Sequence, residues 1–122
     1  MEKIVGNFAL VLLHSVTNMR LLHWLVIDKS YAAHKASGEY CEQMPDLIDS
    51  LIETIMGGDT KFVPVFASDY YVHAPTTQQE MTDLLDFIKE SRQEMPQESD
   101  VQNLIDEITA LVKDTRYLLR AP

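Results

Sequence analysis

The sequence predicts an all-α protein, with four helices in one bundle and a long crossover between the second and third helices. The 122-residue chain contains only 4 Gly and 5 Pro, which are too few for the many tight turns of a β-sandwich or a β-barrel. Apolar residues instead recur at helical spacing in four segments, at approximately residues 3–27, 30–57, 76–95 and 99–120. A chain of this length can bury one core, so we expect a single domain spanning residues 1–122.

The first helix is predicted to be apolar on more than its core-facing side. Its core stripe is expected to consist of Val5, Phe8, Ala9, Leu12, Val16, Met19, His23 and Ile27. A second apolar stripe consists of Leu10, Val11, Leu21, Leu22 and Leu25. Monomers rarely expose this much apolar surface on one helix, so we expect a homo-oligomer, at least a dimer, in which a second copy covers it.

The second helix has a start signal, an internal proline and a stop signal. Ser30 is placed to cap its N-terminus, and Gly57 with Gly58 is placed to end it. Proline lacks a backbone N–H and clashes with the preceding turn. We therefore expect the helix to kink or restart near Pro45.

The segment from residue 59 to residue 75 lacks helical periodicity and is rich in aromatic residues, including Tyr70 and Tyr71, for which we expect packing roles. A segment this long between helices is typical of a crossover that returns the chain across a bundle. The third helix is therefore expected to start at the opposite end of the bundle from the end of the second.

Two capping motifs mark the remaining helices. Thr77-Gln-Gln-Glu80 is a capping box that opens the third helix, and Ser99-Asp-Val-Gln102 opens the fourth in a similar way. Pro96 prevents the third helix from continuing.

The composition excludes several classes of partner. The formal net charge of −9 repels phosphate groups, so we expect no binding to nucleic acid or to an anionic membrane. No apolar run is long enough to span a bilayer, and no targeting segment is visible. Cys41 is the single cysteine, which fits a reducing compartment. We expect a cytoplasmic protein, located in the host cytoplasm or the virion if a phage encodes it.

Two histidines and two carboxylates form the candidate site: His23, His34, Asp49 and Glu53. Asp49 and Glu53 are four residues apart and project from the same face of a helix. His34 precedes Asp49 on that helix by about 22 Å, which is too far for one shared ion. Either the histidine is unrelated to the carboxylates, or a second, antiparallel copy of the helix brings one chain's histidine beside the other's acids.

The same residues carry a resemblance to a known family. The pattern of His23-Trp24, His34, Asp49 and Glu53, followed by glycine, resembles the Dps-like mini-ferritins of the ferritin-like superfamily. The chain end, residues 114–121, also resembles the close of that family's last helix. The segment SYAAHKA, residues 30–36, resembles uncharacterised ferritin-like proteins of phages and large viruses. This resemblance implies a ferritin-like four-helix bundle.

The resemblance also implies a metal site between two subunits. His23 and His34 of one chain would bind the ion together with Asp49 and Glu53 of the partner, a ligand set suited to Fe(II), Mn(II) or Zn(II). Iron would be bound, sequestered and oxidised there, so the protein would be a ferroxidase. One departure from the family pattern is Gly38, which stands where mini-ferritins usually carry a further carboxylate.

Other interpretations of these residues stay open at this point. Each histidine is equally typical of a core or interface position with satisfied ring nitrogens, and Asp49 and Glu53 could instead pair with Arg20 or Arg116. The alternative function is a metal-free structural or interaction protein, encoded by a phage, that retains only the bundle and its dimer face. No role is assigned to His14 or His73.

Overall fold

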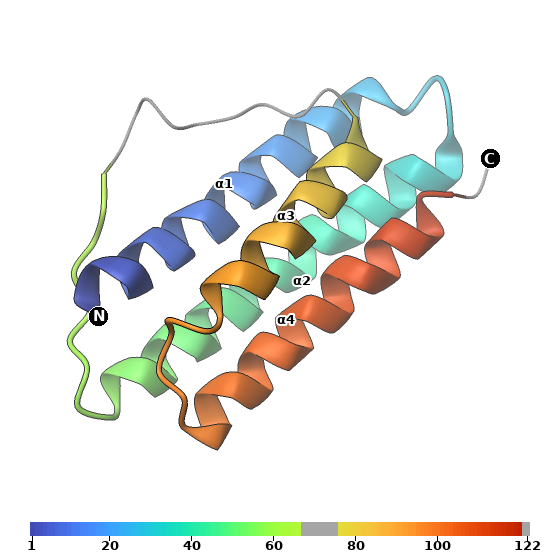
Figure 1. Cartoon of the computed structure of the whole chain (residues 1–122). Helices are drawn as coiled ribbons and strands as arrows, with labels where there is room; N and C mark the ends of the chain where they lie inside the picture. The colour runs from blue at the N-terminus through green and yellow to red at the C-terminus, as the bar shows by residue number, and fades with distance from the viewer. Residues whose placement is uncertain (67–75, 121–122) are drawn as a thin grey trace.

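The computed structural model of the chain describes residues 1–66 and 76–120 and confirms the all-α class (Figure 1). No strand occurs within those residues. The four helices are α1 (Glu2–Leu25), α2 (Tyr31–Met56), α3 (Thr77–Ser91) and α4 (Ser99–Leu118). The sequence predictions for Tyr70, Tyr71, His73 and the final residues 121–122 lie outside the described residues.

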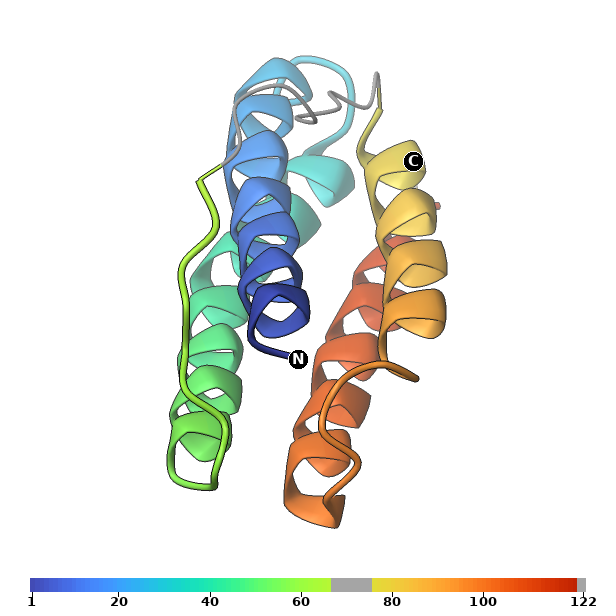
Figure 2. The same cartoon turned by 60° about the vertical axis from the view of Figure 1, so that its left-hand side comes forward.

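The helices form two layers, one made of the α1/α2 hairpin and the other of the α3/α4 hairpin (Figure 2). Helix α1 packs against α2 and α3, and α4 packs against α2 and α3. Helix α2 ends at the same end of the bundle as the N-terminus of the chain, whereas α3 begins at the opposite end (Figure 1). The connection between α2 and α3 therefore has to return along the length of the bundle, as the sequence predicts.

Apolar side chains from all four helices meet between the layers. The residues of the α1 stripe that are fully or almost fully buried are Val5, Phe8, Ala9, Leu12 and Met19. Tyr40 and Leu51 of α2, with Ile105 and Ile108 of α4, are completely buried. Ile27 was expected in the core but is 47% exposed, because α1 ends at Leu25 and Ile27 follows in the turn.

Helix α2 begins and ends as predicted but is not interrupted. The side chain of Ser30 accepts a hydrogen bond from the Ala33 N–H at 3.1 Å, and Gly57 is the C-terminal cap. The helix continues through Pro45 without restarting. Pro45 lies at an exposed position, so the core does not have to accommodate its ring.

The predicted caps of α3 and α4 are each one residue out of place. Thr76, and not Thr77, is the N-cap of α3, and its hydroxyl accepts a hydrogen bond from the Gln79 N–H at 3.1 Å. Two consecutive threonines precede the helix, so the pattern fits either position. Glu98 is the N-cap of α4 and makes no side-chain capping hydrogen bond. Because Thr76 is the cap, Glu80 does not occupy the capping-box position. Its side chain is buried instead, with 8% of the residue exposed.

The described start of the crossover packs against the α1/α2 layer. Phe62 is partly buried against the core, and Val63 passes so close to Gly6 that a Cβ atom on Gly6 would overlap the Val63 carbonyl group. Gly6 therefore allows the crossover to lie directly on α1.

Exposed apolar residues are concentrated in the α1/α2 layer, its turn and the crossover. Those that are more than 60% exposed there are Trp24, Leu25, Tyr31 and Phe66, whereas Tyr117 is the corresponding residue in α4. By length and hydropathy alone, α1 could cross a membrane, although the core helix of a soluble protein also meets that criterion.

Candidate functional site

His23 and His34 lie in direct contact where α1 and α2 meet. Their rings are stacked, with centroids 3.8 Å apart and planes 14° from parallel. His23 is in the last turn of α1 and His34 is in the first turns of α2, so the short turn at residues 26–30 brings them together. The structure therefore joins these two predicted site residues within one chain.

The two histidines are held by reciprocal hydrogen bonds. His23 Nδ1 lies 2.6 Å from the His34 carbonyl oxygen, and His34 Nδ1 lies 2.9 Å from the His23 carbonyl oxygen. A carbonyl oxygen only accepts, so each ring carries its proton on Nδ1 and keeps a lone pair on Nε2. A histidine that binds a metal is commonly oriented in this way, with one nitrogen bonded to a carbonyl group and the other left for the ion.

The same hydrogen bonds have a structural role. The His23 carbonyl is one of the last carbonyls of α1, which a helix leaves without an intrahelical partner. The Nδ1–H of His34 satisfies it and so ties the N-terminus of α2 to the end of α1. Two stacked rings with nearly parallel planes also point their lone pairs in non-converging directions. One ion on both Nε2 atoms would therefore require the rings to turn.

Ser37 and Gly38 shape the pocket of the His23 ring. Ser37 is fully buried, and its hydroxyl lies 3.1 Å from His23 Nδ1 while donating to the Ala33 carbonyl at 2.7 Å. A Cβ atom on Gly38 would lie only 2.9 Å from His23 Cε1 and 3.6 Å from its Nε2. Gly38 thus provides the space in which the ring of His23 lies against α2.

The environment of His23 favours the neutral imidazole. Burial lowers its pKa, and the hydrogen bond to the His34 carbonyl offsets only part of this effect. Electrostatic repulsion from His34 and Arg20 lowers the pKa of His23 further. A neutral imidazole is the form that binds a metal ion.

Asp49 and Glu53 lie farther along α2 and are exposed. In the described part of the chain, neither carboxylate makes a side-chain hydrogen bond or ion pair. The predicted pairing with Arg20 or Arg116 is therefore absent there, and Arg92–Asp106 is the ion pair that is present. Across residues 1–66 and 76–120, no three or more His, Cys, Asp or Glu side chains are grouped closely enough to hold a metal ion.

Sequence reasoning missed a group of buried polar residues between the layers. This buried polar cluster consists of Ser15, Asn18, Tyr40 and Glu80. Tyr40 Oη and Ser15 Oγ are 2.6 Å apart, and Asn18 Nδ2 donates to Glu80 Oε1 at 2.9 Å. The available signal was that Ser15 and Asn18 fall beside Leu12 and Met19 of the predicted core stripe. Leu22, which was expected on the second stripe, is also buried in the core.

Burial controls the ionisation of this cluster. It raises the pKa of Glu80 to about 7, although the hydrogen bond from Asn18 opposes the shift. Burial also raises the pKa of Tyr40, which therefore stays protonated. Glu80 is thus poised between its neutral and charged forms at neutral pH.

Comparison with known proteins places the chain in a family. Residues 26–119 match the model of DUF5856, a family of unknown function, and the chain belongs to that family. A relative is the uncharacterized 14.6 kDa protein in the mobD-ri intergenic region of Enterobacteria phage T4. The two are 36% identical over 93 residues, which cover 75% of this chain and 70% of the phage protein. No solved structure matches the chain.

These findings correct the family suggested by the sequence pattern. The matching family is DUF5856 and the relative is an uncharacterized phage protein, so the assignment to the ferritin-like superfamily and its Dps-like mini-ferritin branch is wrong. The expected likeness to ferritin-like proteins of phages and large viruses is wrong in its family, and the part that holds is the similarity to an uncharacterized phage protein. The spacing of His23, His34, Asp49 and Glu53 has to be interpreted from this structure.

Proposed function

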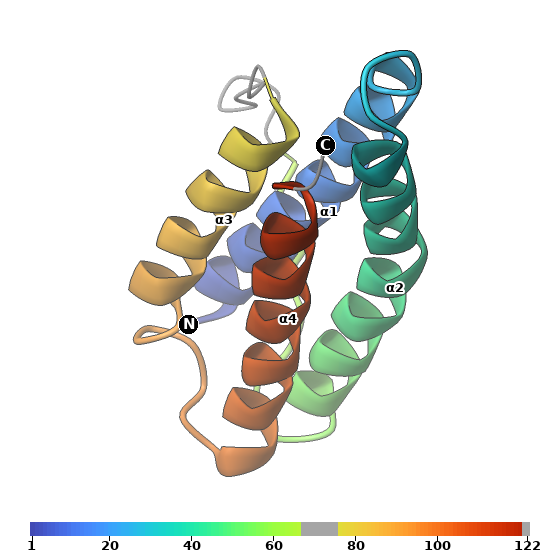
Figure 3. The ribbon, with the colours of Figure 1, turned by 90° about the vertical axis from the view of Figure 1, so that its right-hand side faces the viewer.

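We propose that this protein is a homodimer that binds a divalent transition-metal ion between its subunits, through His23 and His34 of one chain and Asp49 and Glu53 of the other. The observation that carries the proposal is that the stacked rings of His23 and His34 lie against the first part of α2, with each Nδ1 hydrogen-bonded to a carbonyl group, while Asp49 and Glu53 are exposed farther along the same helix. This helix lies at the edge of the bundle, beside α4 (Figure 3).

Helix geometry places the two pairs toward one face of α2. Gly38, over which the His23 ring lies, and Asp49 differ by about 20° around the helix axis and by about 16 Å along it. His34 is displaced from Asp49 by about 60°, and Glu53 by about 40° in the other direction. A partner that covers this face therefore meets histidines at one end and carboxylates at the other.

A single antiparallel register would bring the two ends together. A two-fold axis between residues 43 and 44 pairs His34 with the partner's Glu53 and Gly38 with the partner's Asp49. The same axis pairs Tyr31, which is 71% exposed, with the partner's Met56, which is 48% exposed. One two-fold axis therefore aligns both the proposed metal ligands and the exposed apolar side chains of the two helices. This agreement supports an isologous dimer with two equivalent metal sites.

Charge along α2 favours the same arrangement. The first part of the helix, residues 31–38, contains Lys35 and no acidic residue, whereas residues 39–53 contain five acidic residues and no basic one. Antiparallel packing places the basic end of each helix beside the acidic end of the other, whereas parallel packing places the acidic ends together. The opposite charges at the two ends of α2 therefore favour an antiparallel second copy of the chain as the partner at this face.

The ligand set would be two imidazole nitrogens and two carboxylates, which suits Fe(II), Mn(II) or Zn(II). The fixed Nδ1–H tautomers prepare the Nε2 atoms for binding, and a turn of one ring would let both reach an ion. The bound metal would link the two subunits and stabilise the dimer.

The test is a titration of the purified protein with Zn(II), and with Fe(II) under anaerobic conditions, together with its mass by light scattering. We expect a dimer that binds about one ion per chain, as a site with four side-chain ligands predicts. His34→Ala and Asp49→Asn should each lose binding without unfolding. Asp114→Asn removes an exposed carboxylate from α4 and is the matched control. A protein that stays monomeric or binds neither metal would contradict the proposal.

A metal-free structural or interaction protein is the second candidate, and one observation favours it. The His23–His34 hydrogen bonds satisfy a terminal carbonyl of α1 and stabilise the hairpin without any ion. A dimer that takes up neither Zn(II) nor Fe(II) would support this function and contradict the metal site.

A further inference from the structure

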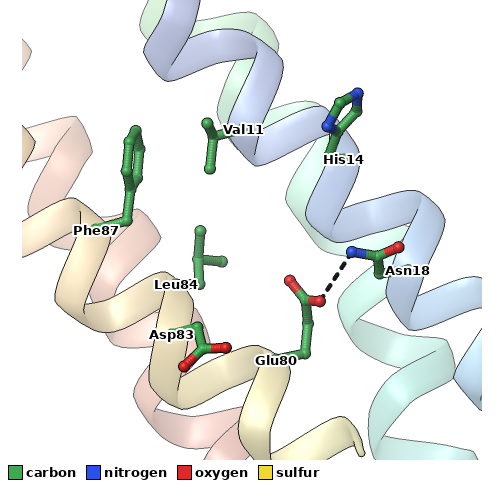
Figure 4. Close-up of a pocket in the computed structure, with 7 residues that line it drawn as sticks. All are labelled: Val11, His14, Asn18, Glu80, Asp83, Leu84 and Phe87. Atoms are coloured by element: carbon green, nitrogen blue, oxygen red, sulfur yellow. Dashed lines mark hydrogen bonds between the residues drawn. The ribbon is translucent and has the colours of Figure 1, made fainter. Parts of the chain in front are cut away.

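A cavity of about 330 Å³ lies between α1 and α3 (Figure 4). Neither His23 nor His34 lines it. Its polar lining comprises His14 and Asn18 of α1 with Glu80 and Asp83 of α3. Its apolar lining comprises Val11, Leu84 and Phe87. The cavity thus has a polar end and an apolar end.

Glu80 is the distinctive residue of the polar end. Its side chain is more than nine-tenths buried and points into the space between the two helices (Figure 4). Asn18 donates to Oε1, but no group within residues 1–66 and 76–120 donates to Oε2. A buried carboxylate oxygen without a donor is costly, and such a group in a native protein calls for a ligand or a bound water molecule.

The charges around the cavity favour a cation as the ligand. Asp83 adds a second carboxylate, which already accepts a hydrogen bond from Gln79 Nε2 at 2.7 Å. Burial lowers the pKa of His14, so its ring adds no positive charge at neutral pH. Tyr40, which approaches Glu80 from α2, stays neutral. Among the described residues, no lysine or arginine lines the cavity.

We propose that this cavity binds a small primary ammonium compound with an apolar group, whose N–H donates to Glu80 Oε2. The apolar group would lie against Val11, Leu84 and Phe87, and the Phe87 ring would add an attraction for the cation. An ammonium group offers three donors, so Asp83 can accept a second one. The volume is sufficient for a compound of this size, and its apolar wall distinguishes the site from one for a bare metal ion.

The proposal does not depend on metal binding between subunits, because the cavity uses none of the four metal-site residues. Binding should strengthen as the pH rises through about 7, because burial raises the pKa of Glu80 to about 7 and the ammonium needs the carboxylate. Below this pH, each binding event would have to release the proton of Glu80.

The test uses benzylammonium and its neutral analogue benzyl alcohol as probes, with binding followed by two-dimensional NMR at about pH 8, above the pKa of Glu80. We expect saturable shifts at the cavity residues with benzylammonium and binding at least about tenfold weaker with benzyl alcohol, as the loss of a charged hydrogen bond predicts. Equal binding of the two probes, or no saturable binding of benzylammonium, would overturn the proposal.

Three variants locate the site. Glu80→Gln should weaken benzylammonium binding about tenfold, because it keeps the shape and removes the charge. Glu90→Gln removes an exposed carboxylate from the same helix and should bind like wild type. Val11→Phe should block the cavity without changing Glu80. Unchanged binding in Glu80→Gln or Val11→Phe, or weakened binding in Glu90→Gln, would overturn the assignment.

Discussion

The two layers of the bundle bury similar cores but have different outer surfaces. In the α1/α2 layer, Trp24, Leu25 and Tyr31 are each more than 60% exposed, and the surface also bears the stacked histidines and the acidic half of α2. In the α3/α4 layer, the exposed large apolar residues within the described chain are Tyr117 and Leu118, at the end of α4. A core explains the burial in both layers, and the exposed apolar residues of the first layer are the ones that the proposed dimer would cover.

The hairpin turns differ in the same way. The α3/α4 turn is held by Arg92, whose guanidinium donates to Gln102 Oε1 at 2.9 Å and to Asp106 Oδ1 at 2.7 Å. These bonds are complete within the chain. The α1/α2 turn is held by two histidines whose Nε2 atoms have no described partner. The hydrogen bonds of the α3/α4 turn are thus complete within the chain, whereas the α1/α2 turn leaves two imidazole nitrogens that the proposed metal ion would use.

The largest expected effect is on dimerisation, and it distinguishes the outer surface of the α1/α2 layer from that of the α3/α4 layer. Trp24→Glu combined with Tyr31→Glu should convert the proposed dimer into a monomer, because two charges would be buried at an apolar interface. Tyr117→Glu, which places the same charge on α4, should leave the dimer intact. Light scattering at several concentrations measures both. Dissociation by Tyr117→Glu alone would assign the interface to the other layer.

Gly38→Ala should affect the metal site more than the fold. The new Cβ would displace the His23 ring, so Zn(II) affinity should fall about tenfold or more, as the loss of an oriented ligand predicts. The higher helix propensity of alanine offsets part of the cost, so the free energy of unfolding should change by less than about 1 kcal/mol. Titration and urea denaturation measure the two effects.

Gly58→Ala is the matched control, since its Cβ would make an ordinary contact at 3.5 Å with the Ile55 carbonyl oxygen. Equal losses of Zn(II) affinity in both variants would show that Gly38 has no special relation to the site.

Glu80→Gln should change how stability depends on pH. A glutamate with its pKa raised from 4.5 to about 7 keeps its proton in the folded state after the unfolded chain has lost it. Wild type should therefore lose stability relative to Glu80→Gln as the pH rises between these values, by at most about 1.4 kcal/mol per pH unit. Urea denaturation at several pH values measures the free energy of unfolding of both proteins. If it changed with pH in the same way in both, burial of Glu80 between α1 and α3 would not control its ionisation.

The smallest expected effect concerns the α3/α4 turn. Arg92→Ala should reduce the free energy of unfolding by about 1 kcal/mol, because it removes charged but partly exposed hydrogen bonds. Asp106→Asn, at a side chain that is 62% exposed, should have almost no effect. Thermal and urea denaturation measure both. Loss of dimerisation or metal binding in Arg92→Ala would mean that the layers are not independent.

The helices and the candidate residues could be predicted from the sequence, but their contacts could not. Helical periodicity and the Ser30 cap define where α2 begins, and the four-residue spacing aligns Asp49 with Glu53. Nothing in the spacing shows that His23 and His34 exchange hydrogen bonds with each other's carbonyls, since that depends on the α1/α2 turn. Gly38 was interpreted as a missing ligand, yet it makes room for the ring of His23 on α1.

Two errors have clear physical reasons. The Thr-Thr-Gln-Gln-Glu sequence allows either threonine to cap α3, and choosing Thr77 gave Glu80 a capping role that hid its burial. The mini-ferritin assignment depended on a few polar residues at helical spacing, which a hairpin of amphipathic helices can also produce. The family match over residues 26–119 draws on many more positions.

The central claim is that histidines and carboxylates from different chains share a metal ion, and trans-complementation tests it most directly. One variant carries His23→Ala and His34→Ala, and the other carries Asp49→Asn and Glu53→Gln; both are unfolded together, refolded as an equal mixture and titrated with Zn(II). Each variant alone should bind no ion. Random pairing into dimers predicts that the mixture recovers about a quarter of the wild-type sites. No recovery in the mixture, despite a dimeric mass, would contradict the intersubunit site.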